Sequence, residues 1–448
     1  MSGGGNLKGL RKGLAAAAAA LLLLGGCAFP QSGVESLLAA PRLSEEQSEI
    51  YSALVRETGN DIKLLYPQRG ENRSAFLVIN LDEEATDEAV AFYQSTSVNV
   101  TSSIHMAVLD KLDGEWRSVH DISLEGSQVE DASVMREGGS VLLAVGLTYS
   151  SDNASLLKIY SFNGRTMDEM YSESYQAKII CDMDGDDRDD VVLVSSGTEE
   201  VSAFAKLLVY EDGHFLEKGR AITDPTITRY SSILSGYLKN GQRAVYLDAY
   251  RGSTAMTTEI LAYAEDSGGY LMNLTYDALS VKSYPVDRPL GAESVDLNND
   301  SVVEVPGLTA MPGYEADQAG AFFLTTWYNF LDGEYQKVKS SYVNASQGYM
   351  LDFPAEWEGR VSVRKSAQSN ETLFYEYQEG DNPVKSELLY IQMVKRSDWE
   401  SSANYSGYEV ISSSGGGQIV YLACIPAGAD PALRMTMEEV KKNFSRYY

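Results

Sequence analysis

The chain has 448 residues and a formal net charge of −28 at pH 7, from 36 basic and 64 acidic residues. This acidic excess excludes nucleic acid as a partner, because nucleic-acid binding requires Lys and Arg patches that neutralise phosphates, and it attracts divalent cations. A hydrophobic content of 44% indicates globular domains, of which this length allows two or three.

The first 26 residues have the pattern of a targeting segment. Three basic residues precede an apolar run over residues 14–24, which is too short to span a bilayer comfortably. The run ends in the sequence LGGC, which resembles the lipobox of bacterial lipoproteins, whose signal is cleaved before a lipid-bearing cysteine. The resemblance implies a lipoprotein signal peptide over 1–26, lipid on Cys27, and attachment to the extracytoplasmic face of a bacterial membrane. The alternative is an ordinary secretory signal with an incidental cysteine.

Residues 27–42 have the composition of a tether, and residues 43–59 are predicted to form one short helix. Ser44 suits the N-cap position, acidic residues occupy the first turn, and Gly59 suits the end.

From residue 60 to residue 345 one pattern recurs five times. An apolar strand is followed by a hairpin with an Asp-Gly or Asn-Gly turn signal, since these residues accept the positive φ that such turns require. Five such units at similar spacing predict a mainly β fold, with a β-propeller of about five blades over 60–345 and an open β-solenoid as the alternative. The turn glycines are Gly114, Gly164, Gly213, Gly269 and Gly333.

Three acidic loops occupy matching places, just before the strand that precedes a hairpin. In each loop oxygen-bearing side chains stand at positions 1, 3, 5 and 9, so a chain that curls around a cation can direct them inward. Ca²⁺ takes six to eight oxygen ligands at about 2.3–2.6 Å, and carboxylates packed this closely repel one another unless a cation compensates them. The sequence therefore predicts Ca²⁺. The predicted ligands are Asp182, Asp184, Asp186 and Asp190 in one loop, Asp296, Asn298, Asp300 and Glu304 in the second, and Asn80, Asp82, Glu84 and Glu88 in the third, the weakest candidate.

These loops resemble those of FG-GAP and VCBS repeats, whose pattern is D-x-D-x-D-G-x-x-D between two strands. The resemblance implies a structural Ca²⁺ and adds backbone carbonyl ligands at Arg188 and Val302. The chain departs from the pattern at position 6, where Asp187, Ser301 and Ala85 replace the family's glycine. For each loop the alternative is a solvated acidic turn whose side chains cap their own backbone.

Residues 346–448 follow a different pattern, with four or five strands and a final helix, and predict a small α+β domain. Its opening, GYMLDFPAEW, resembles the start of PsbP-like domains, and the whole chain resembles clostridial surface lipoproteins with degenerate FG-GAP/VCBS repeats. Trp357, Trp399 and Tyr377 form either a ligand-binding face or, as is commoner for such residues, part of the core.

Little in the sequence points to an enzyme. His105, His120 and His214 follow no metal-ligand spacing, and no nucleophile-elbow, zinc-protease or phosphate-loop motif occurs. We therefore expect a non-enzymatic binding or scaffold protein, anchored to the membrane through its lipid, with an extracellular protein or glycan as ligand. The alternative is a surface glycan-processing hydrolase, which would need a buried carboxylate pair with raised pKa values in a cleft away from the acidic loops.

Overall fold

The computed structural model describes residues 43–82, 84–96, 103–149, 155–195, 197, 202–264, 269–277, 286–289, 291–366 and 369–447. This part of the chain is mainly β, as predicted. The proposed signal peptide, Cys27 and the tether lie outside the described residues. Within the described ranges, no helix combines the length and the apolar character that a bilayer crossing requires.

Helix α3 (Glu45–Thr58) forms where the sequence predicts it. Ser44 and Gln47 cap its first turn reciprocally, and the N–H of Gly59 closes its last turn. Its buried residues, Ile50 and Leu54 among them, pack in one apolar cluster with strands of the sheet that follows.

The described residues after this helix form six antiparallel sheets. Sheet 1 contains β1 (Ile62–Leu65), β2 (Phe76–Ile79), β3 (Glu88–Ser95), β4 (Ile104–Leu112) and β5 (Glu115–Leu124). Sheet 2 contains β6 (Gln128–Glu137), β7 (Ser140–Thr148), β8 (Ser155–Phe162) and β9 (Met167–Tyr175). Sheet 3 contains β10 (Ala177–Cys181), β11 (Asp190–Ser195), β12 (Phe204–Glu211) and β13 (His214–Ile222).

The three remaining sheets complete the chain. Sheet 4 contains β14 (Ile227–Tyr237), β15 (Arg243–Arg251), β16 (Ala255–Ala264), β17 (Tyr270–Asn273) and β18 (Arg288–Pro289). Sheet 5 contains β19 (Val305–Ala310), β20 (Phe323–Leu331), β21 (Glu334–Asn344), β22 (Tyr349–Asp352) and the C-terminal β28 (Phe444–Arg446). Sheet 6 contains β23 (Val361–Lys365), β24 (Thr372–Tyr377), β25 (Val384–Lys395), β27 (Ile419–Cys424) and β26 (Glu409–Ser414).

The predicted Asp-Gly turns close their hairpins. At residues 113–114, 212–213 and 332–333 both central residues have positive φ, between 50° and 83°, which is the conformation of a type I′ turn. Each turn joins two strands that pair directly in the same sheet: β4 with β5, β12 with β13, and β20 with β21.

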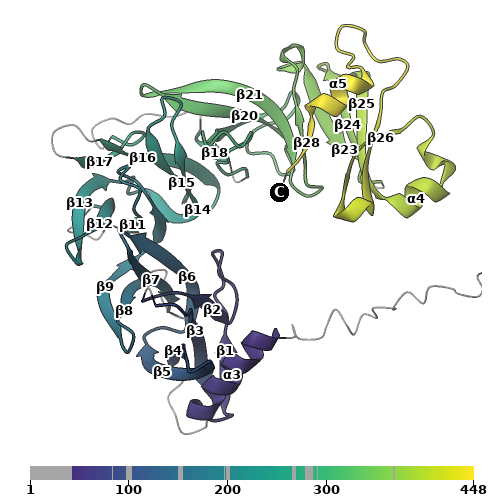
Figure 1. The fold of residues 1–448 in the computed structure, drawn as a ribbon. Helices are drawn as coiled ribbons and strands as arrows, with labels where there is room; N and C mark the ends of the chain where they lie inside the picture. The colour runs from purple at the N-terminus through teal and green to yellow at the C-terminus, as the bar shows by residue number, and fades with distance from the viewer. Residues whose placement is uncertain are drawn as a thin grey trace, which may run out of the picture.

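Consecutive sheets share apolar cores, and the sheets therefore stack face to face. In β11, Val192 and Val194 point to a core shared with sheet 4, whereas Val191 and Leu193 point to a core shared with sheet 2. Because both faces of such a strand are buried, the strand is a continuous apolar run instead of an alternating one. Figure 1 shows the sheets along an open arc, with sheet 1 and sheet 6 at opposite ends.

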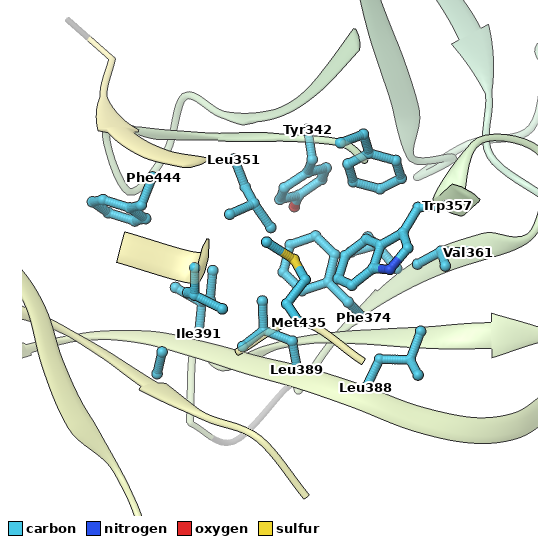
Figure 2. Close-up of a cluster of buried hydrophobic side chains, with 14 of the residues drawn as sticks. Tyr342, Leu351, Trp357, Val361, Phe374, Leu388, Leu389, Ile391, Met435 and Phe444 are labelled. Atoms are coloured by element: carbon cyan, nitrogen blue, oxygen red, sulfur yellow. The ribbon is translucent and has the colours of Figure 1, made fainter. Parts of the chain in front are cut away.

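Sheet 6 carries the short helix α4 (Arg396–Ser401), the 3₁₀ turns η1 (Ala355–Trp357), η2 (Ala403–Tyr405) and η3 (Gly415–Gly417), and the final helix α5 (Met437–Asn443). Thr436 caps α5. Trp357 is a core residue: it is 1% exposed, donates from Nε1 to the carbonyl of Leu433 at 2.7 Å, and lies among the side chains of Figure 2. Because Trp357 is buried, the three aromatic residues do not form one surface, although Trp399 on α4 and Tyr377 at the end of β24 are half-buried.

The hairpin turns provide a direct stability test. Gly333 has a φ of 82°, and a Cβ built on it would meet nothing within 4 Å. Gly333→Ala should therefore lower the free energy of unfolding by about 1 kcal/mol through backbone strain alone. Gly428, which has equal space but no positive φ, is the matched control, and Gly428→Ala should leave stability unchanged or slightly raised. Urea midpoints measure both; equal losses at the two positions would contradict the turn assignment.

Candidate metal centre

The acidic loop between β10 and β11 brings three carboxylates together. Ligand oxygens of Asp182, Asp184 and Asp190 all lie within 4.8 Å of one another, and among the described residues this is the one such group of three or more acidic, His or Cys side chains. Asp190 is 3% exposed at the start of β11, where its Oδ2 accepts from the backbone N–H of Met183 at 2.9 Å. The start of a buried strand thus holds the innermost carboxylate in place.

Hydrogen bonds to the loop's own backbone shape the turn. Asp182 accepts from the N–H of Gly185 at 2.7 Å and from the N–H of Asp187 at 3.0 Å. Asp187 adopts a φ of 64° at the position where the FG-GAP/VCBS loop pattern has glycine. Aspartate tolerates this region better than most residues, so the tight turn forms without the glycine.

Basic side chains from three places compensate three of the loop's acids. Arg243 at the start of β15 pairs with Asp182 at 3.1 Å, and Lys218 of β13 pairs with Asp184 at 2.8 Å. Asp186 pairs with Arg188, whose Nε donates to it at 2.8 Å. The sequence predicts that these carboxylates repel one another unless a cation is bound. The structure shows that basic side chains of the protein itself already compensate part of this charge.

Asp190 differs from the other three acids in its environment. It is bonded to two backbone N–H groups, those of Met183 and Asp184. Burial, with a further contribution from the charge of Asp184, raises its pKa to about 7. Of the ligands predicted in this loop, Asp182, Asp184 and Asp190 converge, whereas the carboxylate of Asp186 is occupied by Arg188.

The loop between β18 and β19 repeats these hydrogen bonds. Asp296 accepts from the N–H of Ser301 at 2.8 Å, and Asn298 accepts from Asp300 at 3.1 Å. Asp300 accepts from Val302 at 2.9 Å, and the buried Glu304 accepts from the loop at 3.0 Å through the N–H of Leu297. The second loop has the same pattern of hydrogen bonds as the first. Its carboxylates, those of Asp296, Asp300 and Glu304, do not converge as those of the first loop do.

The loop between β2 and β3 keeps part of the pattern. Glu88 is 1% exposed and accepts from the N–H of Leu81 at 2.6 Å, and burial raises its pKa to about 7. Asp82 accepts from the N–H of Glu84 at 3.1 Å. Asn80, however, donates from its side chain to the carbonyl of Glu84, so it caps the turn.

A cavity of about 460 Å³ lies between the first two loops and is lined by Asp182, Asp296, Arg243 and Tyr237. The N–H of Tyr237 donates to the carbonyl of Ser301 at 2.8 Å, which fastens the second loop to the end of β14. Arg243 reaches the first loop from β15, and residues 238–242 join these two strands. The two acidic loops are therefore connected through one turn of sheet 4.

A larger groove of about 930 Å³ runs across the first four sheets. It is lined by residues of β2, β6, β10 and β14 and of the loop before β2. The sequence motifs did not point to this groove, because its lining, apart from Asp189 of the first acidic loop, comes from segments that carry no motif.

The histidines form no metal site among the described residues. His105 lies in a hydrogen-bonded row, with Ser103 at 3.1 Å and Asp121 at 2.9 Å. His214 contacts the carbonyl of Asp212 at 3.0 Å in a hairpin turn. None of these residues lines the cavity or the groove described above.

One buried carboxylate pair lies away from the acidic loops. The N–H of Asp224 donates to Glu259 Oε1 at 2.9 Å, and the two residues are 4% and 2% exposed. Burial raises the pKa of Glu259 to about 7. Although burial opposes it, hydrogen bonds from Thr226 and the nearby Arg251 lower the pKa of Asp224. Neither carboxylate lines the two cavities described above, so the pair has no substrate cleft there.

No known family profile matches the chain, and no curated protein matches it. Solved structures similar to it include a rhamnogalacturonan lyase from Bacillus licheniformis, with 10% identity over 84% of this chain and 93% of that one and a TM-score of 0.28. Sqt1 from Chaetomium thermophilum has 10% identity, coverages of 75% and 90%, and a TM-score of 0.29. An α-L-arabinanase from Penicillium chrysogenum has 12% identity, coverages of 84% and 97%, and a TM-score of 0.26. Likenesses this distant carry no conclusion about function.

Glu259 gives the stability of the protein a definite pH dependence. Its pKa rises from 4.5 to about 7 on folding, so the folded state holds a proton that the unfolded chain has lost between these values. Stability should therefore fall as pH rises from 5 to 8. Glu259→Gln should make this profile less steep, while Asp190 and Glu88, whose pKa values are also raised to about 7, keep part of the slope. The substitution should raise stability at pH 8 by on the order of 1 kcal/mol.

Thermal unfolding of both proteins from pH 5 to pH 8 measures this effect. Glu334→Gln, at an exposed hairpin position, is the control for loss of one carboxylate. Parallel pH profiles for Glu259→Gln and the unsubstituted protein would show that Glu259 does not bind the proton.

Proposed function

We propose that this protein is a lipid-anchored, non-enzymatic binding or scaffold protein on the extracytoplasmic face of a bacterial membrane, with a structural Ca²⁺ in the loop between β10 and β11. The observation that carries the proposal is the convergence of Asp182, Asp184 and Asp190. Three hard oxygen ligands on one turn suit Ca²⁺ better than a soft metal.

The surroundings of the loop support a stabilising role for the cation. Its ligands belong to sheet 3, while Arg243 joins the same loop to sheet 4. A cation held here fixes the connection between β10 and β11, next to the core that the two sheets share. If Ca²⁺ binds only the folded state, a Ca²⁺ concentration one hundred times its Kd raises the free energy of unfolding by about 2.7 kcal/mol.

The remaining parts of the proposal follow from the sequence. Sheets 1–5 are degenerate FG-GAP/VCBS-type repeats in a propeller-like arrangement of about five blades. Residues 346–448 form a small α+β domain that also contributes strands β22 and β28 to sheet 5. Lipid on Cys27 supplies the membrane attachment. The loops at 296 and 80 are weaker Ca²⁺ sites, and the ligand is an extracellular protein or glycan.

The alternative is a surface glycan-processing hydrolase, for which Asp224 and Glu259 are the nearest match to a carboxylate pair. Their divergent pKa values suit acid–base chemistry. Their burial favours a structural role, because a reacting sugar needs access to both carboxylates. The binding role is therefore the better supported of the two.

Thermal unfolding of the full chain in detergent, first in EGTA and then with Ca²⁺ or Mg²⁺, tests the metal proposal. Millimolar Ca²⁺ should raise Tm by several degrees and Mg²⁺ by much less, because the loop offers a flexible set of oxygens instead of an octahedral cage. Asp184→Ala should reduce the Ca²⁺ shift strongly.

Asp187→Gly is the matched control, since it removes a carboxylate from the same loop but not from the converging group. This variant should keep the full Ca²⁺ shift. If Ca²⁺ does not raise the Tm of the unsubstituted protein, the loop is an acidic turn without a bound cation. The same conclusion holds if Asp184→Ala and Asp187→Gly reduce the Ca²⁺-induced rise in Tm equally.

A further inference from the structure

The inner side of the arc is formed by edge strands. β6, β10 and β14 are each the terminal strand of their sheet, with another strand of that sheet on one side only. Isolated backbone contacts, from Arg69 to β6 and from Val302 to the end of β14, occur on the other side. Figure 1 shows β6 and β14 on the inner side of the arc, with β9 and β13 on the outer side. The groove of about 930 Å³ follows this inner side and lies in the size range of ligand sites.

The groove is close to neutral on a strongly acidic protein. Its lining has four acidic and three basic residues, whereas the chain as a whole carries −28. Lys178 is neutralised by Asp131 at 2.6 Å, and Arg69 lies 3.6 Å from Glu130. These charges are compensated within the protein, so the groove offers few unpaired charges to a charged ligand. An uncharged polar ligand does not need such charges for its binding free energy.

Bulges interrupt two of the edge strands where they line the groove. The pairing register shifts at Glu130 in β6 and at Ser231 in β14. Such bulges twist an edge away from further strand pairing and turn individual side chains outward. Addition of a peptide strand is therefore disfavoured at both edges, while side-chain recognition is favoured.

Apart from Val134, the apolar residues of the lining belong to the cores. Leu77 packs into the core between sheets 1 and 2, and Ile179 and Ile233 pack into the core between sheets 3 and 4. The groove therefore offers amides and hydroxyls, such as those of Ser133, Gln176 and Ser232, with no separate apolar subsite among these residues. Amides and hydroxyls both donate and accept hydrogen bonds, as sugar hydroxyls do.

We propose that this groove binds a neutral oligosaccharide. The inference rests on the proposed role as a binding protein and names its ligand class and its site. The sugar chain lies along the inner side of the arc and is held by side chains of β6 and β14 and of the segment that joins β9 to β10.

Calorimetric titration of the full chain in detergent tests the proposal. The probes are cellohexaose, xylohexaose, mannohexaose and chitohexaose, with hexagalacturonate as the charged counterpart and an uncharged hexapeptide as the strand-forming one. At least one neutral hexaose should bind, and Ser133→Trp, which fills the groove, should weaken it at least tenfold. Gln176→Ala should weaken it severalfold without adding bulk, so the test survives if the Trp variant fails to fold.

Ser123→Trp is the matched control on the exposed outer strand β5 and should bind as the unsubstituted protein does. Binding of hexagalacturonate or the peptide alone, binding of no probe, or equal losses of affinity in the Ser123 and Ser133 variants would each overturn the proposal.

Titrations in EGTA and in Ca²⁺ distinguish a failure of the sugar site from a failure of the metal site. A lost Ca²⁺ shift with intact sugar binding refutes only the metal site, and the reverse result refutes only the sugar site.

Discussion

The structure depends on the burial of both faces of each sheet between its neighbours. A single four-stranded sheet exposes two apolar faces, and neither can be covered by the sheet's own residues. Sheets 2 and 3 bury facing apolar surfaces in one shared core, and sheets 3 and 4 bury theirs in a second shared core. Helix α3 covers the free face of sheet 1, and sheet 6 covers sheet 5 at the other end. The stack therefore needs no closure into a ring to bury its apolar surface.

This stacking determines where polar function can reside. Strand interiors are committed to the cores, so ligand-binding groups are left to the loops and to the edge strands. The acidic loops precede inner strands such as β11, whose first residue, Asp190, is already buried. The groove forms from β6, β10 and β14, which have another strand of their sheet on one side only.

The sequence predicts the parts of this arrangement that have strong local signals. Asp-Gly turns specify the hairpins, and the run at 191–194 specifies a strand buried on both faces. Strands β6 and β14 were not predicted, because their half-buried residues follow neither an apolar run nor a clean alternation. The partners of the acidic loop were also missed. Lys218 and Arg243 lie far along the chain from it, and only the stacking of sheets brings them near.

These basic partners change the physics of the candidate metal centre. A loop whose carboxylates repelled one another would be held together only by a cation, and removal of the cation would unfold it. Here Lys218 and Arg243 already offset the repulsion, so a bound Ca²⁺ contributes only the difference between its own interactions and those of the displaced ammonium and guanidinium groups. Asp190 has no such substitute, since its Oδ2 is bonded to backbone N–H groups and its pKa is raised. The gain from a cation is therefore concentrated at the buried end of the loop, where burial makes an ionised carboxylate most costly.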